Sequence, residues 1–67
     1  MEGWVKVYAT GQFTQASMVR NLLESKDISA LSLNKQDSSY LFGEHEIYVK
    51  QEDAVRAKHI LSSTLNE

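Results

Sequence analysis

The pattern of apolar and polar positions predicts three strands and two helices in the order β-α-β-β-α. Apolar residues alternate with polar ones over residues 4–9, 28–34 and 44–50, which is typical of half-buried strands. Elsewhere apolar residues recur at three- and four-residue spacing, which predicts two amphipathic helices. The first is expected to begin near Gln12 or Phe13 and to end over residues 25–27, and the second to open at Gln51 and to fray over residues 62–67. No proline or internal repeat interrupts this order.

The alternation gives each strand a face that is expected to be buried. The aliphatic positions share this face and are expected to point toward the helices: Val5, Val7, Ala9, Leu31, Leu33, Ile47 and Val49. The opposite face of the first and third strands is expected to stay uncovered and carries Trp4, Lys6, Tyr8, Glu46, Tyr48 and Lys50.

Each helix has an apolar stripe that would cover the sheet. The stripes consist of Phe13, Ala16, Val19 (with Met18), Leu22 and Leu23 in the first helix and of Ala54, Ala57, Ile60 (with Leu61) and Leu65 in the second. No glycine ends the first helix, so Lys26 or Asp27 is expected to take a left-handed conformation, which aspartate tolerates better than most residues.

These elements predict an α+β fold, a two-layer sandwich with both helices on one face of the sheet. A right-handed crossover makes the first and second strands parallel and leaves a slot between them. The third strand fits this slot, which gives a three-stranded antiparallel sheet of order 1-3-2. This ferredoxin-like arrangement lacks the fourth strand, so the first strand has an open edge. We expect residues 1–67 to form a single domain.

Size and composition narrow the functional classes. The chain has 67 residues, a net charge of −2 and a pI of about 5.6, which disfavours nucleic acid as the partner because phosphate binding relies on lysine and arginine. It has no cysteine, hence no disulfide or thiolate zinc site. No apolar run approaches the roughly 20 residues of a membrane span. The N-terminus lacks signal-peptide features, so we expect a cytoplasmic location.

Several segments resemble a small prokaryotic family labelled putative signal-transducing proteins, a domain of unknown function. They are residues 4–8, 33–40 and 43–49 and the Asp-Ala-x-x-Ala-Lys start of the second helix. The resemblance spans nearly the whole chain and implies a ferredoxin-like fold, similar in outline to the nitrogen-signalling trimers. The chain lacks the long nucleotide-binding loop of those trimers, so no ATP or other cofactor is expected.

The polar loop over residues 34–43 is a candidate ligand site. Its amide, charged and hydroxyl side chains could converge on a small polar or anionic molecule and belong to Asn34, Lys35, Asp37, Ser38 and Ser39. The structural alternative is that Asp37 and Ser38 bond their own backbone and shape the connection. An aspartate beside two serines is no catalytic triad, because no histidine is fixed beside them.

The uncovered sheet face is the second candidate. Its predicted interface residues are Trp4, Lys6, Tyr8, Tyr48 and Lys50. Aromatic and lysine side chains on such a sheet can stack RNA bases, but Glu46 shares the face and the chain is acidic. An exposed patch of this kind more often marks a protein interface.

No metal or catalytic site is expected. His45 and His59 lie far apart in sequence, on a strand and a helix, whereas a transition metal needs three or four converging ligands. We therefore interpret the chain as a non-enzymatic regulatory module that acts through protein contacts, with a homodimer as the first candidate assembly. The alternative is a small-ligand sensor that uses the loop over residues 34–43.

Overall fold

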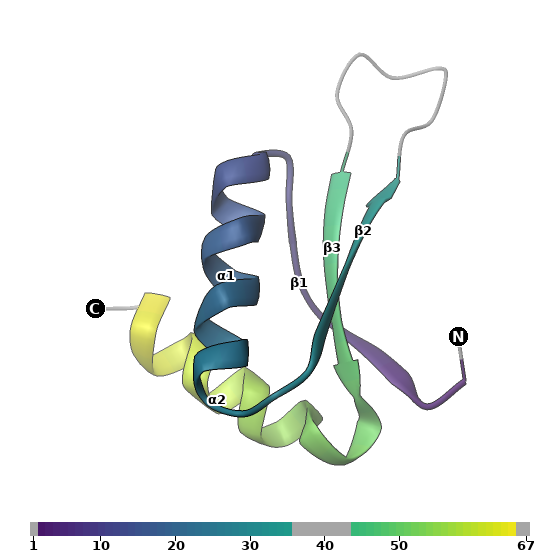
Figure 1. The fold of residues 1–67 in the computed structure, drawn as a ribbon, viewed down its shortest axis with the longest axis vertical. Helices are drawn as coiled ribbons and strands as arrows, with labels where there is room; N and C mark the ends of the chain where they lie inside the picture. Colours follow the sequence, from purple (N-terminus) through teal and green to yellow (C-terminus); the bar gives the residue numbers. More distant parts are fainter. Residues whose placement is uncertain (1, 36–43, 66–67) are drawn as a thin grey trace.

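The structure is a computed structural model that describes residues 2–35 and 44–65. The elements are β1 (Trp4–Thr10), α1 (Phe13–Ser25), β2 (Ala30–Lys35), β3 (Glu44–Lys50), the short 3-10 helix η1 (Gln51–Asp53) and α2 (Ala54–Leu65). Figure 1 shows the two helices together on one side of the sheet. The predicted element order is therefore confirmed, and the strand and helix limits differ from the predicted ones by only a few residues.

The sheet has the predicted order β1-β3-β2, and β3 runs antiparallel to both neighbours. This confirms the α+β fold with a three-stranded antiparallel sheet. Because each is antiparallel to β3, β1 and β2 are parallel to each other and flank β3, and α1 connects them (Figure 1). As a consequence both β1 and β2 are edge strands.

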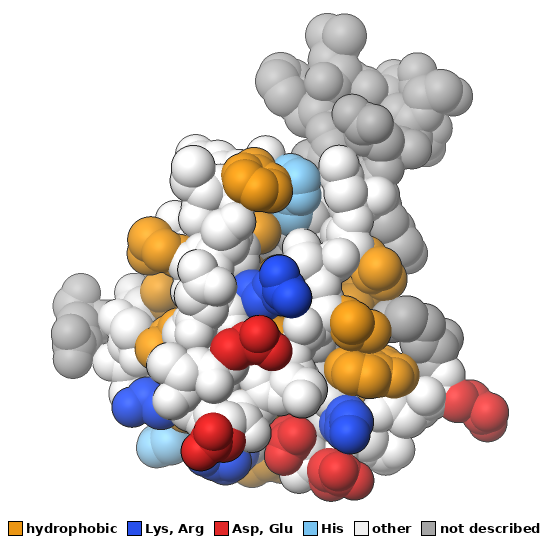
Figure 2. Space-filling view, in the orientation of Figure 1, with side chains coloured by type: hydrophobic (Ala, Val, Ile, Leu, Met, Phe, Trp, Pro, Cys, Tyr) orange, Lys and Arg blue, Asp and Glu red, His pale blue; other side chains and the backbone are white. Residues whose placement is uncertain are grey.

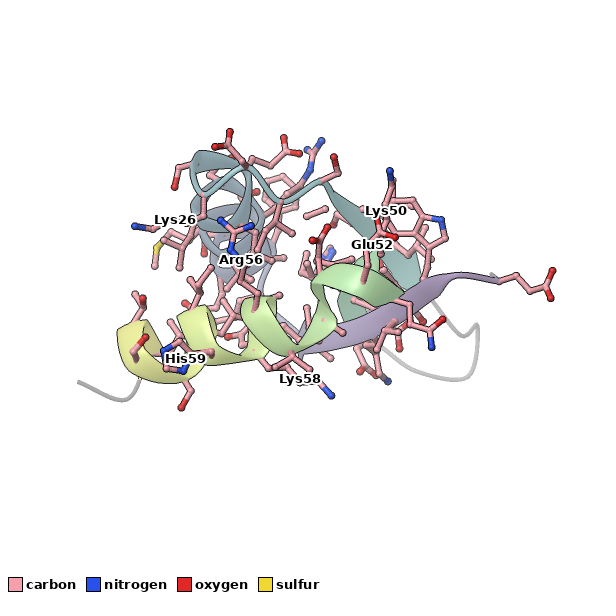
Figure 3. The ribbon with its side chains drawn as sticks, turned by 90° about the horizontal axis from the view of Figure 1, so that it is seen from below. Lys26, Lys50, Glu52, Arg56, Lys58 and His59 are labelled. Carbon is pink, nitrogen blue, oxygen red and sulfur yellow. The ribbon has the colours of Figure 1, made fainter. Side chains whose placement is uncertain are left out.

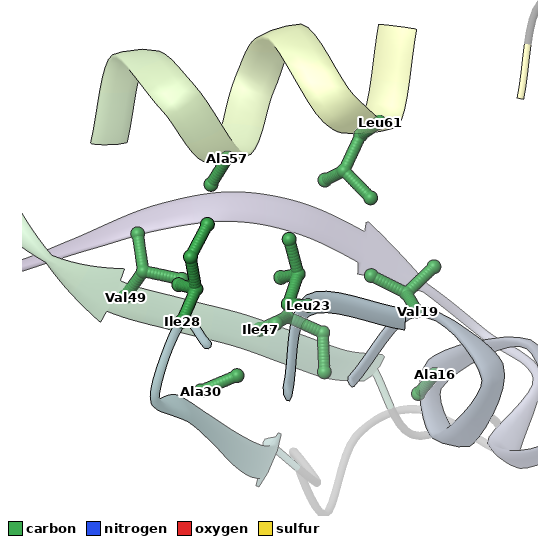
Figure 4. Close-up of a cluster of buried hydrophobic side chains, with 9 residues drawn as sticks. All are labelled: Ala16, Val19, Leu23, Ile28, Ala30, Ile47, Val49, Ala57 and Leu61. Atoms are coloured by element: carbon green, nitrogen blue, oxygen red, sulfur yellow. The ribbon is translucent and has the colours of Figure 1, made fainter. Parts of the chain in front are cut away.

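The core lies between the sheet and the two helices. Figure 4 shows its side chains reaching inward from both layers. Its buried members are Ala16, Val19, Leu23, Ile28, Ala30, Ile47, Val49, Ala57 and Leu61. The two alanines of the helices, Ala16 and Ala57, let α1 and α2 approach the strands closely because they carry only a methyl group. Burying a large aliphatic side chain contributes about 1.5–3 kcal/mol, so this cluster supplies most of the driving force for folding.

The end of α1 is a Schellman-type cap that passes directly into the core. Asp27 takes the predicted left-handed conformation, with φ of 64°. Its N–H donates to the carbonyl of Glu24 (3.1 Å), and the N–H of Ile28 donates to the carbonyl of Leu23 (3.0 Å). Leu23 and Ile28 are both buried, which supplies the apolar contact that usually accompanies this cap.

The face assignment predicted for β2 is wrong. Ala30 pairs with the buried Val49, whereas Leu31 pairs with Tyr48 and Leu33 with Glu46 on the other face. Since Ile28 is drawn into the core by the helix cap, period-two alternation places Ala30 inside. Leu31 and Leu33 therefore lie on the sheet face opposite the helices.

The alternation predicted for β1 fails at its middle. The register shifts between Lys6 and Tyr8, and such a bulge brings two successive side chains to the same side. Val7 and Tyr8 accordingly both pack against the core, and Tyr8 pairs with the buried Ile47. Ala9 is moved to the open face, opposite Glu46, and is exposed.

The helix stripes are confirmed in their centres and wrong at some positions. In α1 the stripe holds for Ala16, Val19 and Leu23, but Phe13 is 70% exposed. Its ring lies edge-on to the ring of His45, with centroids 5.8 Å apart. Phe13 begins the helix, so it lies beyond the end of the core and covers only the side of one strand.

We predict that Asp27→Gly stabilises the fold and that Asp27→Ala destabilises it. Glycine has no Cβ to clash in the left-handed region, whereas alanine meets a penalty of about 1 kcal/mol there. Urea denaturation followed by circular dichroism measures both changes in the free energy of unfolding. The same pair of substitutions at exposed Asn21, inside the helix, is the control: there alanine should be the more stable variant by about 1 kcal/mol. Equal effects at the two positions would contradict the assigned cap.

Candidate functional site

The sheet face opposite the helices carries a band of apolar and aromatic side chains. Register places Trp4 opposite Lys50 and Lys6 opposite Tyr48, on the face opposite to that of Val49. Leu31 and Leu33 join them from β2, and Leu31 is 39% exposed. Figure 2 shows apolar side chains gathered on the right of the molecule, where β2 and β3 lie in Figure 1. We call this surface, formed by Trp4, Lys6, Leu31, Leu33, Glu46, Tyr48 and Lys50, the open face.

An ion pair lies at the centre of the open face. Glu46 is 4% exposed, although no helix covers this side of the sheet. Its Oε2 lies 3.2 Å from the ammonium nitrogen of Lys6, and its Oε1 accepts a hydrogen bond of 2.9 Å from the hydroxyl of Tyr48. Ala9 and Leu33 flank Glu46 on the neighbouring strands and help to exclude water.

The ion pair shifts the titration of its lysine. The hydrogen bond from Lys6 to Glu46, followed by the charge of that carboxylate, raises the pKa of Lys6 above its ordinary value of 10.5. The lysine side chain is about half exposed, at 49%, so water still screens the interaction. Both oxygens of Glu46 accept hydrogen bonds from neighbouring side chains, which suits a structural carboxylate rather than a proton acceptor for a substrate.

The structure gathers most, but not all, of the predicted interface residues. Trp4, Lys6, Tyr48 and Lys50 share the open face as predicted. Tyr8 does not, because the bulge turns it toward the core. Sequence analysis missed Leu31 and Leu33 as members. The sequence Ile28-Ser29-Ala30 after the helix cap could have revealed them. An isoleucine next to the cap is buried, so the residues at even spacing from it point inward and Leu31 and Leu33 point outward.

The predicted ligand loop lies mostly outside the described residues. Asp37, Ser38 and Ser39 fall in the segment that the structure does not describe. Asn34 is exposed and lies opposite His45, on the face that carries the helices. Lys35 ends β2 opposite Glu44. The ligand-binding role of these residues therefore stays a prediction.

Charged side chains and a histidine lie along η1, the first half of α2 and the end of α1, as Figure 3 shows for the labelled Lys26, Lys50, Glu52, Arg56, Lys58 and His59. Arg56 has a structural role, because its guanidinium donates to the carbonyl of Lys26 at 2.7 Å and so joins α2 to the end of α1. Glu52 and Asp53 lie in the preceding 3-10 helix, so both signs of charge are present. Among residues 2–35 and 44–65, no three histidine, cysteine or acidic side chains are placed to hold a metal ion.

A small pocket lies between the two helices. It has a volume of about 340 Å³ and is lined by Met18, Val19, Asn21, Leu22, Thr64 and Leu65. Its lining is mainly apolar and contains no ionisable side chain, so it offers little to a small charged ligand.

Comparison with known proteins identifies one family. A family model described as "putative prokaryotic signal transducing protein" matches residues 4–64, which include every described helix and strand except the last residue of α2. No curated protein and no solved structure matches the chain. In the described part of the chain, no helix is long and apolar enough to cross a membrane.

We predict that Glu46→Gln lowers the pKa of Lys6 toward 10.5, because the amide keeps the shape of the carboxylate without its charge. By linkage, a raised folded-state pKa stabilises the protein fully below pH 10.5, and this contribution is lost as pH rises through the folded-state pKa. Carbon-13 NMR of the lysine Cε resonances across an alkaline titration measures the change. Lys58, in α2, is the internal control, and an unchanged Lys6 titration in the variant would contradict the assigned ion pair.

Proposed function

The chain belongs to the prokaryotic family described as putative signal transducing proteins, and from this premise we propose that it is a non-enzymatic module that acts through protein–protein contacts made by the open face. The observation that carries the proposal is the position of Leu31 and Leu33, which join Trp4 and Tyr48 on the sheet side without helices. Leu31 is exposed and the other three are half-buried, and a chain of this size gains little by leaving them partly in water, so a partner surface is their simplest use.

The composition of the open face supports a protein partner. Its apolar and aromatic side chains surround one ion pair, in which Glu46 is buried and Lys6 is half exposed, and Lys50 lies at the rim. Protein interfaces typically combine an apolar and aromatic centre with a polar rim. Nucleic acid fits less well, because the acidic Glu46 occupies the middle of the face and the net charge of the chain is −2.

We further propose that the first partner is a second copy of the chain. Three strands leave two edges in each sheet, and homodimers with a two-fold axis are the commonest assemblies of soluble proteins. A dimer would also add buried apolar surface to a domain that is small for independent stability. We also propose a cytoplasmic location, and the sensor role of the loop over residues 34–43 remains the alternative proposal.

We predict that Leu33→Asp weakens self-association at least about tenfold, which corresponds to about 1.4 kcal/mol. A carboxylate at this position lies opposite Glu46, and the approach of a second copy would remove water from two neighbouring like charges, which is unfavourable. Sedimentation equilibrium at micromolar concentration gives the dissociation constant.

The matched control is Val55→Asp, which places the same charge at an apolar position that is 83% exposed on α2, away from the open face. It should leave the dissociation constant unchanged. The proposal of self-association is wrong if the unmodified chain is monomeric, or if both variants weaken the dimer equally.

A further inference from the structure

The edge of β2 is closed at its first residue by two side chains of α1. The main-chain N–H of Ala30 donates to Oε2 of Glu24 at 3.4 Å, and its carbonyl accepts a hydrogen bond of 3.3 Å from Nε of Arg20. Glu24 and Arg20 are four residues apart and therefore lie on one face of the helix. Together they occupy both main-chain groups of Ala30 that would otherwise face solvent.

This contact identifies which main-chain groups of β2 point outward. In an antiparallel pair, successive residues direct their N–H and C=O alternately toward the neighbouring strand and away from it. Since Ala30 directs both groups to α1, Leu31 and Leu33 direct theirs to β3, and Ser32 and Asn34 direct theirs outward. Among the described residues, no side chain bonds to the main chain of Ser32 or Asn34.

The two edges of the sheet differ in how well they can accept another strand. The bulge between Lys6 and Tyr8 interrupts the regular spacing of β1, and bulges and lysines are devices that block edge pairing. β2 pairs with β3 without a bulge from Ala30 to Lys35. Figure 1 shows β2 along the near side of the sheet, with neither helix in front of it.

We propose that β2 pairs antiparallel with β2 of a second copy of the chain, with the two-fold axis at Leu33. Ser32 of each copy would exchange main-chain hydrogen bonds with Asn34 of the other, which produces one sheet of twice the strand number. The two Leu33 side chains would meet on the open face, so that the open faces of both copies form one surface. This inference rests on the self-association proposed above and specifies its geometry.

The α1 side chains select this register. Pairing centred on Ser32 would require the main chain of Ala30 to bond with Asn34 of the second copy, but Arg20 and Glu24 already occupy those groups. Pairing centred on Leu33 uses Ser32 and Asn34 and leaves Ala30 outside the new ladder. The side chains of Ser32 and Asn34 are of modest size, and Asn34 is exposed, so they present little obstacle to a neighbouring strand.

The ion pair on the open face favours edge pairing over face-to-face packing. Packing two open faces together would remove the remaining water from Lys6, which is half exposed beside Glu46. Full desolvation of an ion pair can cost more than its Coulomb attraction returns. Edge pairing at β2 leaves Lys6 in water, because β3 separates β1 from the new interface.

Cysteine cross-linking tests the geometry, since the chain has no cysteine of its own. Residues in a directly opposed pair that is not hydrogen-bonded have Cα atoms about 4.5 Å apart, within the range of a disulfide. The two copies of Leu33→Cys should therefore cross-link. In the same dimer the two copies of Leu31→Cys would lie about 13 Å apart along the strands, too far for a disulfide.

We expect Leu33→Cys to form a covalent dimer at least about tenfold faster than Leu31→Cys under mild oxidation at micromolar concentration. Leu31 is the matched control because it lies on the same face of the same strand. Cross-linking of Leu31→Cys at an equal or greater rate would overturn the proposed geometry, while self-association itself would stand. Monomers without cross-links would overturn both.

The fluorescence of Trp4, the single tryptophan, provides a second measurement on the unmodified chain. Trp4 lies on β1, so edge pairing at β2 leaves its surroundings unchanged and its emission maximum should not move when dilution dissociates the dimer. A blue-shifted emission in the dimer would show that the open faces pack on one another, and would overturn edge pairing without affecting self-association.

Discussion

The structure depends on the way the end of α1 is joined to the core. The Schellman-type cap brings Ile28 directly over Leu23, and both side chains are fully buried. Only a left-handed residue between them makes the turn short enough, and Asp27 supplies it. Because the strand begins two residues after Ile28, the cap also determines which side chains of β2 point inward. One local turn thus determines the composition of both faces of the sheet.

The bulge in β1 has a comparable effect on the other edge strand. It turns Tyr8 into the core and places Ala9, a small residue, beside Glu46. An alternating strand would have put tyrosine on the open face near the carboxylate. With alanine there, Glu46 instead receives its hydrogen bonds from Tyr48 and Lys6, and the ion pair forms in the middle of the open face. The bulge and the cap together produce a surface that is apolar around a buried charge.

These two devices explain which predictions from sequence were right. Periodicity depends on neighbouring residues, so it located the strands, the helices and the sheet order, and it placed Ile47 and Val49 in the core. The phase of β2 depends on the helix cap, and hydrophobicity alone favoured turning Leu31 inward. The bulge depends on the fit between β1 and its neighbour, and no residue type in β1 announces it. The open face was therefore predicted with Trp4 and Tyr48 but without Leu31 and Leu33. Most of the polar loop over residues 34–43 lies outside the described residues, so its predicted role is not tested.

The contacts of Arg20 and Glu24 bear on how a small sheet with an exposed edge limits the strands that can pair with it. An edge of unpaired main-chain groups invites pairing in many registers, including those that lead to aggregation. Closing the whole edge would prevent every assembly, whereas closing it at Ala30 alone removes the registers that extend past that residue. A two-fold pair then has a defined end, because a longer ladder would have to displace a charged side chain from a hydrogen bond. Arg20 and Glu24, which satisfy the main chain of Ala30 within one chain, can in this way limit how two chains pair. The specificity then comes from blocking unwanted registers and not from added attraction.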